Sequence, residues 1–172
     1  MSDPLRSAVI AEAATWLRTP YHHMGRLKGV GCDCLTLLAE VYGRVGAIPR
    51  IVIPYYPPDW HLHRGVERYM DGLLDYAREI EAAGPGDVAL FRFGRCYSHG
   101  AIVTDWPRLI HAWHAGGVMR SDATQPLLAG RAVRFFSPFP AADGLFASPC
   151  VMRTVAGAHM PGGPFAAPGA GR

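Results

Sequence analysis

The stretch GCDCLTLLAEVYGRVG, residues 31–46, contains the pattern that determines how the first half of this chain folds. Its apolar side chains recur every three or four positions, which is the spacing of a helix with one buried face. Asp33 stands before this pattern as a helix N-cap, and Gly46 stands at its end. The sequence therefore predicts a helix that has Cys34 in its first turn. The positions expected to face the core are Leu37, Leu38, Val41, Tyr42 and Val45.

The segment before this helix begins with a second helix signal. Asp3-Pro4 is a cap followed by proline at the first helical position, and the apolar spacing that follows predicts a helix ending before Pro20. Residues 20–31 contain three glycines and no steady period, so we expect a loop there.

The segment after the helix begins with a connector, residues 53–60, that is rich in proline and tyrosine. Residues 66–80 then show a helical period, which Gly84-Pro85 ends. The sequence therefore predicts a third helix in the first half of the chain.

Beyond Gly86 the pattern changes from helical to strand-like. Short runs of aliphatic and aromatic residues alternate with glycine, proline, aspartate and serine, as in an antiparallel meander. Residues 96–98 look like a turn before one of these strands. Helices followed by strands favour an α+β fold, with N-terminal helices packed on a C-terminal antiparallel sheet. The predicted strands are residues 88–93, 99–104, 108–113, 118–120 and 132–136.

The composition is that of a folded protein with a modest positive charge. Of the 172 residues, 49% are hydrophobic and 18% are charged, and the formal net charge is +3. Lysine and arginine are scattered, so the sequence predicts no nucleic-acid partner. No stretch reaches the roughly 18 apolar residues of a membrane span, and the N-terminus lacks the pattern of a signal peptide.

The chain is expected to divide into one domain and a C-terminal segment. Residues 1–140 are long enough to enclose one hydrophobic core. Residues 141–172 are rich in alanine, glycine and proline and have little to bury on folding. We therefore expect this segment to be flexible or to dock on a partner protein.

Three side chains from distant parts of the sequence could form a nucleophilic site. Cys34 lies where the N–H groups of a helix start favour a thiolate and lower the thiol pKa. His99 could accept the thiol proton, and His111 on the next strand could hold the His99 ring. A hairpin through residues 105–107 would bring the two histidines together. Taken singly, however, a buried cysteine is more often inert packing, and a lone His99 is as often a core histidine.

Two other sites could use residues of the same region. Cys32, Cys34, His22 and His23 could bind zinc, although their spacing matches no usual structural zinc site. A disulfide between Cys32 and Cys34 would be strained, so we expect reduced thiols. A group of aromatic residues could line a ligand groove, although such residues beside a helix more often belong to the core. The members of this group are Tyr55, Tyr56, Trp60 and Tyr69.

Five short motifs, in this order, resemble those of the NlpC family of bacterial cell-wall cysteine peptidases. The resemblance extends from about residue 5 to residue 136. Residues 55–63 look most like the peptidases encoded in the tail-assembly gene clusters of phages and gene transfer agents. The five motifs are Thr19-Pro20-Tyr21, Asp33-Cys34 at a helix start, Gly86-Asp87 before a strand, His99-Gly100 and Ile110-His111-Ala112.

The resemblance implies a papain-like peptidase domain over residues 1–140 that uses no cofactor and no metal. Cys34 would attack an amide carbonyl of the peptidoglycan stem peptide, typically between D-glutamate and the diamino acid. His99 would serve as the base and His111 would orient it. Tyr21 and Asp33 would contact the oxyanion or the substrate.

The resemblance also implies a place of action and partners. We expect synthesis in the bacterial cytoplasm, assembly with hub proteins into the tail tip or baseplate of a phage-like particle, and action in the cell wall or periplasm. Two alternatives stay open: a structural tail component with a vestigial site, or a thiol acyltransferase with the same three residues. The chain departs from the family at two places. Leu35-Thr36 follows the nucleophile where the family usually has Ser or Ala and then Gly, and Cys32 is an additional cysteine.

Overall fold

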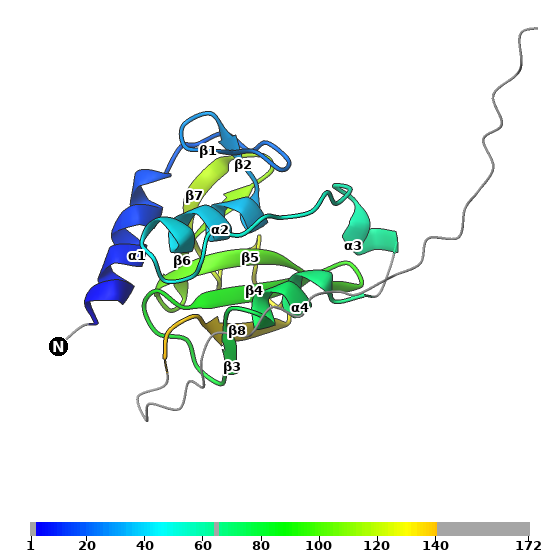
Figure 1. The fold of residues 1–172 in the computed structure, drawn as a ribbon. Coiled ribbons are helices and arrows are strands. Elements are labelled where there is room, and N and C mark those ends of the chain that lie inside the picture. The colour runs from blue at the N-terminus through cyan, green and yellow to red at the C-terminus, as the bar shows by residue number, and fades with distance from the viewer. Residues whose placement is uncertain (1–2, 64–65, 141–172) are drawn as a thin grey trace, which may run out of the picture.

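The computed structural model describes residues 3–63 and 66–140, in which helices pack on one face of a six-stranded antiparallel sheet (Figure 1). The predicted α+β class is confirmed by this arrangement. No helix of the described residues is long and apolar enough to cross a membrane. The predicted C-terminal segment, residues 141–172, lies outside the described residues.

The first two helices begin at the predicted caps. α1 (Pro4–Thr15) follows Asp3, whose side chain accepts a hydrogen bond from a backbone N–H of the first turn at 2.9 Å. α2 (Cys34–Arg44) follows Asp33, which forms a reciprocal capping box with Thr36. Cys34 is therefore the first residue of α2, as the sequence predicts.

The predicted third helix is wrong in its second half. α4 (Arg68–Leu74) has only seven residues, and a short α3 (Trp60–His63) precedes it. The next residues form strand β3 (Arg78–Ile80), which pairs with β8 (Val133–Ser137). This pairing satisfies backbone groups on the outer edge of β8 that would stay open beside a helix. Residues 78–80 therefore form a strand despite their helical period, because they pair with a strand that lies far along the chain.

A meander of four consecutive strands forms the main part of the sheet: β4 (Val88–Phe93), β5 (Cys96–Asp105), β6 (Arg108–Trp113) and β7 (Gly117–Asp122). β8 returns to pair with β4, so the strand order is β3-β8-β4-β5-β6-β7. β4 and β6 have the predicted bounds. β5 starts earlier than predicted, because Cys96 and Tyr97 pair with Phe93 and Arg92. The turn predicted at residues 96–98 is therefore wrong.

The predicted loop before α2 contains a small hairpin of β1 (Arg26–Leu27) and β2 (Gly31–Cys32). Tyr21 joins it through a single bridge to Cys32. The Cys32 N–H donates to the Pro20 carbonyl at 3.1 Å. These contacts fix the backbone just before the Asp33 cap.

The main core lies between the helices and one face of the sheet. Val9 and Ala13 of α1, and Trp16 directly after it, are fully buried there together with residues of α2 and of the central strands. A smaller cluster, which includes Phe91 and Leu128, covers the opposite face. The sheet is thus packed on both faces.

Gly100 on β5 allows α4 to approach the start of α2. The Tyr69 hydroxyl of α4 occupies the space where a side chain at position 100 would begin. From there it donates a hydrogen bond to the Cys34 carbonyl at 3.2 Å. The missing side chain of Gly100 therefore lets a buried tyrosine contact the residue predicted to be the nucleophile.

Gly100→Ala should destabilise the protein, because the added methyl would overlap the Tyr69 hydroxyl and lie 3.1 Å from Leu38 Cδ2. We expect the free energy of unfolding to fall by about 1–3 kcal/mol, as is usual for an overpacked core. Gly72→Ala is the matched control, since nothing lies within 4 Å of the added carbon on α4. Urea denaturation measures both variants, and equal stability of the two would contradict this packing.

Candidate active site

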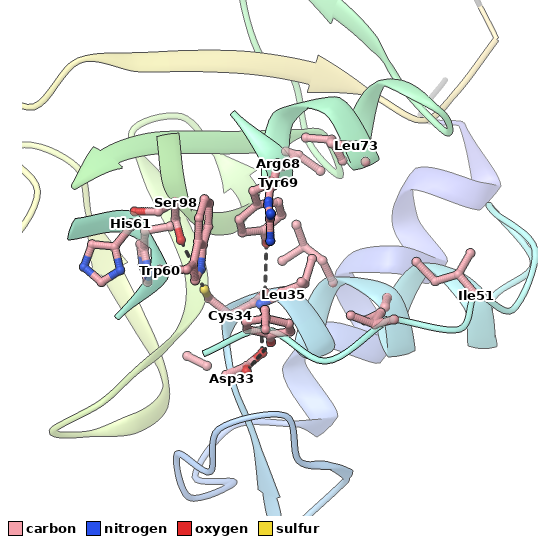
Figure 2. Close-up of a pocket in the computed structure, with 18 of the residues that line it drawn as sticks. Asp33, Cys34, Leu35, Ile51, Trp60, His61, Arg68, Tyr69, Leu73 and Ser98 are labelled. Atoms are coloured by element: carbon pink, nitrogen blue, oxygen red, sulfur yellow. Dashed lines mark hydrogen bonds between the residues drawn. The ribbon is translucent and has the colours of Figure 1, made fainter. Parts of the chain in front are cut away.

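Cys34 is held from outside its own helix (Figure 2). Its thiol donates to the Ser98 carbonyl of β5 at a sulfur–oxygen distance of 3.8 Å. Tyr69 of α4 holds the Cys34 carbonyl, as described above. The sheet and α4 together fix the sulfur beside the strand that carries His99.

Asp33 connects the start of α2 to two loops. Its side chain is buried, with 2% exposure, and its carboxylate accepts from the Thr36 N–H at 2.9 Å and from the Met24 N–H at 2.8 Å. The Tyr56 hydroxyl, from the connector, donates to the same carboxylate. A carboxylate occupied in this way positions Cys34, and its negative charge would repel an oxyanion. Asp33 also lines the cavity, and its predicted role toward the oxyanion or the substrate stays a prediction.

His99 on β5 and His111 on β6 form a buried pair. Their exposures are 6% and 0%, and His99 Nε2 lies 2.6 Å from His111 Nδ1. His111 Nε2 lies 2.9 Å from Ser121 Oγ on β7. Three neighbouring strands thus supply a chain of three hydrogen-bonding side chains.

The proton positions along this chain decide whether His99 can be a base. If His99 carries its proton on Nε2, it donates to His111 Nδ1, and His111 then donates through Nε2 to Ser121. This arrangement leaves His99 Nδ1 free to accept a proton. The opposite arrangement, with Ser121 donating, would leave Nδ1 protonated. Ser121 therefore takes part in setting the tautomer of both rings.

Aromatic rings enclose the His99 imidazole. The Phe93 and Trp113 rings lie edge-on to it at centroid distances of 5.3 and 5.4 Å. Such packing limits rotation of the ring and keeps bulk water away from it. The base candidate is therefore fixed in orientation before any substrate binds.

Burial keeps both partners of the reaction neutral at rest. Burial, followed by the Asp33 carboxylate, raises the pKa of the Cys34 thiol to about 12, against the smaller opposite effect of nearby backbone N–H groups. The expected net lowering of this pKa is therefore wrong. Burial and the neighbouring His111 hold the pKa of His99 well below its usual range. Both shifts favour a neutral thiol beside a neutral imidazole over a thiolate–imidazolium pair.

A cavity of about 660 Å³ opens beside these groups and is lined by Cys34, His99 and Tyr21 among others. Burial raises the pKa of Tyr21, so its hydroxyl remains a hydrogen-bond donor at neutral pH. The aromatic group of Tyr55, Tyr56, Trp60 and Tyr69 also lines this cavity. Tyr69 also belongs to the core and Trp60 packs against it, whereas Tyr55 is 76% exposed, so both alternatives describe part of this group.

The alternative zinc residues do not form a donor cluster. Within residues 3–63 and 66–140, no group of three or more His, Cys, Asp or Glu side chains could hold a metal ion. Cys32 is fully buried, and burial raises its thiol pKa to about 12. The cysteines of the described residues are free thiols, as expected.

Two residues of the site were not identified from the sequence. Thr36, noted only as a departure from the family pattern, completes the cap: its hydroxyl accepts from the Asp33 N–H at 2.9 Å. Its spacing of three from Asp33 is a capping-box signal that could have revealed this role. Ser121 has no local signal, because its contact with His111 depends on how β6 and β7 pair.

Comparisons with known proteins support the fold. No protein-family model and no curated protein sequence matches this chain. An NLP/P60-family lipoprotein-like protein from Staphylococcus aureus is similar with a TM-score of 0.54 and 22% identity, over 78% of this chain and 42% of its own. The peptidoglycan hydrolase RipB from Mycobacterium tuberculosis gives 0.54 and 18%, over 80% and 66%.

A third solved structure has a different role. RipD from Mycobacterium tuberculosis, described as a non-catalytic NlpC/p60 domain protein adapted to peptidoglycan binding, gives a TM-score of 0.52 and 14% identity, over 79% of this chain and 98% of its own. This chain spans less than half of the Staphylococcus aureus protein. The three similarities show that the chain has the papain-like α+β fold of NlpC/P60 domains.

The buried histidines should make the protein sensitive to acid. Burial lowers the pKa of His111 from 6.5 to about 4, so below pH 6.5 the unfolded chain takes up a proton that the folded protein resists. Above pH 6.5 His111 is neutral in both states and costs no stability. As the pH drops to 4, the protonation of His111 in the unfolded chain should lower the free energy of unfolding by about 3 kcal/mol. Urea denaturation at pH 7 and pH 4 measures the difference.

His111→Gln should reduce this pH dependence, whereas His114→Gln, at an exposed position, should leave it unchanged. An identical pH dependence in the His111→Gln variant and the wild type would contradict the assignment.

Proposed function

We propose that this protein is a cysteine peptidase that hydrolyses an amide bond in peptidoglycan stem peptides. The observation that carries the proposal is the buried pair of His99 and His111, joined at 2.6 Å, of which His99 lines the same cavity as Cys34. Solved structures with the same fold include the peptidoglycan hydrolases RipB and SagA. The finer choice of the bond between D-glutamate and the diamino acid is supported by the resemblance in motifs.

In the proposed mechanism, Cys34 Sγ attacks the amide carbonyl while its proton passes to His99 Nδ1. The Cys34 backbone N–H, which no carbonyl of the described residues accepts, and the Tyr21 hydroxyl then stabilise the oxyanion. His99 gives its proton to the leaving amine, and water cleaves the thioester that results. His111 and Ser121 keep the His99 ring in the orientation and tautomer that these steps need.

Cys34→Ala should abolish the release of peptides from purified peptidoglycan, because it removes the only atom that forms the thioester. Cys32→Ala is the matched control: it removes a buried thiol two residues away and should retain activity. Mass spectrometry of the released muropeptides measures both and identifies the bond. Full activity of the Cys34→Ala variant would exclude the mechanism.

The same experiment tests the other functions considered. A wild-type protein with reduced Cys34 that releases no peptides would favour a binding or structural role, as described for RipD. Products that carry an added amine in place of water would favour a thiol acyltransferase.

We further propose that the peptidase is part of the tail tip or baseplate of a phage-like particle and opens the cell wall during DNA delivery. The resemblance of residues 55–63 to the peptidases of tail-assembly gene clusters supports this. Synthesis in the bacterial cytoplasm and docking on hub proteins belong to the same proposal. Mass spectrometry of purified particles should find the chain in the tail fraction; particles that lack it would contradict the assignment.

A further inference from the structure

Arg68 places a positive charge in the wall of the catalytic cavity. It is the first residue of α4 and lines the same cavity as Cys34 and His99. Figure 2 shows its side chain extending from α4, beside Tyr69, into the space above Cys34. Among the described residues that line this cavity, Arg68 is the only lysine or arginine.

The Arg68 guanidinium has no partner among the described residues. The adjacent carboxylate, Glu67, is already used: it accepts from the Tyr97 N–H at 2.8 Å. Asp75 also lines the cavity, but it lies seven residues along, which is about 10 Å on a helix. By contrast, Arg6 is paired with Asp87 at 2.9 Å and Arg26 with Glu40 at 2.8 Å.

Arg68 is an exposed residue, and an anion bound to it would also contact the cavity wall. Much of the cavity wall is apolar and includes Leu35, Leu38, Leu73 and Trp60. Charge-assisted hydrogen bonds gain strength where water is partly excluded. The carboxylate of Asp33, which lies near the sulfur, already accepts hydrogen bonds from Met24, Thr36 and Tyr56. Arg68 is therefore available to pair with a negative charge of the ligand.

We propose that Arg68 binds a free carboxylate of the substrate beside the amide that Cys34 attacks. The proposal rests on the proposed peptidase function and specifies how the site selects its substrate. D-Glutamate joined through its side-chain carboxyl keeps its main-chain carboxylate, and a diamino acid that ends the peptide also has a free carboxylate next to the bond. An internal peptide bond of an ordinary protein has no carboxylate at that place. The planar guanidinium is suited to bind a carboxylate through two hydrogen bonds.

The test compares three synthetic dipeptides of γ-D-glutamate and a diamino acid: one with free carboxylates, one amidated on the D-glutamyl α-carboxyl and one amidated on the diamino acid. Arg68→Gln should lower kcat/KM for the free dipeptide by about 10- to 100-fold, the usual effect of losing a charge-assisted pair. For one of the amidated dipeptides, wild type and variant should differ by less than about twofold, which identifies the carboxylate that Arg68 binds. Arg68→Lys should retain part of the activity.

Arg120→Gln, which removes an exposed arginine that does not line the cavity, is the matched control and should behave like the wild type. An equal loss on all three dipeptides, or no loss on any, would overturn the role of Arg68 while the peptidase function stands. If the wild type cleaves none of them, the proposed function fails. Calorimetric affinities of the Cys34→Ala protein, with and without Arg68→Gln, for the same dipeptides then decide whether Arg68 binds the carboxylate.

Discussion

The buried carboxylate of Asp33 is a single group that joins three segments of the chain. It caps α2, accepts from Met24 in the preceding loop and accepts from Tyr56 in the connector. A charge with 2% exposure is tolerated only when such donors surround it. One wall of the cavity and the position of Cys34 therefore depend on the same hydrogen-bonded group.

The site is divided between the two layers of the fold. The helical layer carries the sulfur, and the sheet carries both imidazoles on adjacent strands. Two contacts set the distance between the layers: Cys34 with the Ser98 carbonyl, and Tyr69 packed against Gly100. The chemistry thus depends on how helices and sheet pack, although no catalytic candidate belongs to the hydrophobic core itself.

Local signals account for the part of the structure that could be predicted. The Asp3 and Asp33 caps and the uniform apolar runs of β4 and β6 depend on residues close in sequence, and these elements lie where expected. The error at β3 arose because its partner β8 lies more than 50 residues away. Ser121 was missed for another reason: it lies one residue beyond the predicted strand 118–120, and the register of β6 with β7 brings it to His111.

The thiol pKa was misjudged for a different reason. The helix start does favour a thiolate, but the residue that caps it is an acid, and its negative charge adds to the effect of burial. In the Asp-Cys pair the helix start thus lowers the thiol pKa, and the aspartate raises it. Their balance depends on how deeply the folded chain buries the sulfur, which the sequence pattern does not reveal.

A protonated sulfur is also a poor target for peroxide and for alkylating reagents, because both react with the thiolate. The raised pKa of Cys34 favours the protonated thiol. The Asp33 cap therefore both positions the sulfur and, by helping to raise its pKa, slows its oxidation and alkylation. A protein that must wait a long time outside a reducing cytosol before it meets its substrate would benefit from this resistance to oxidative inactivation.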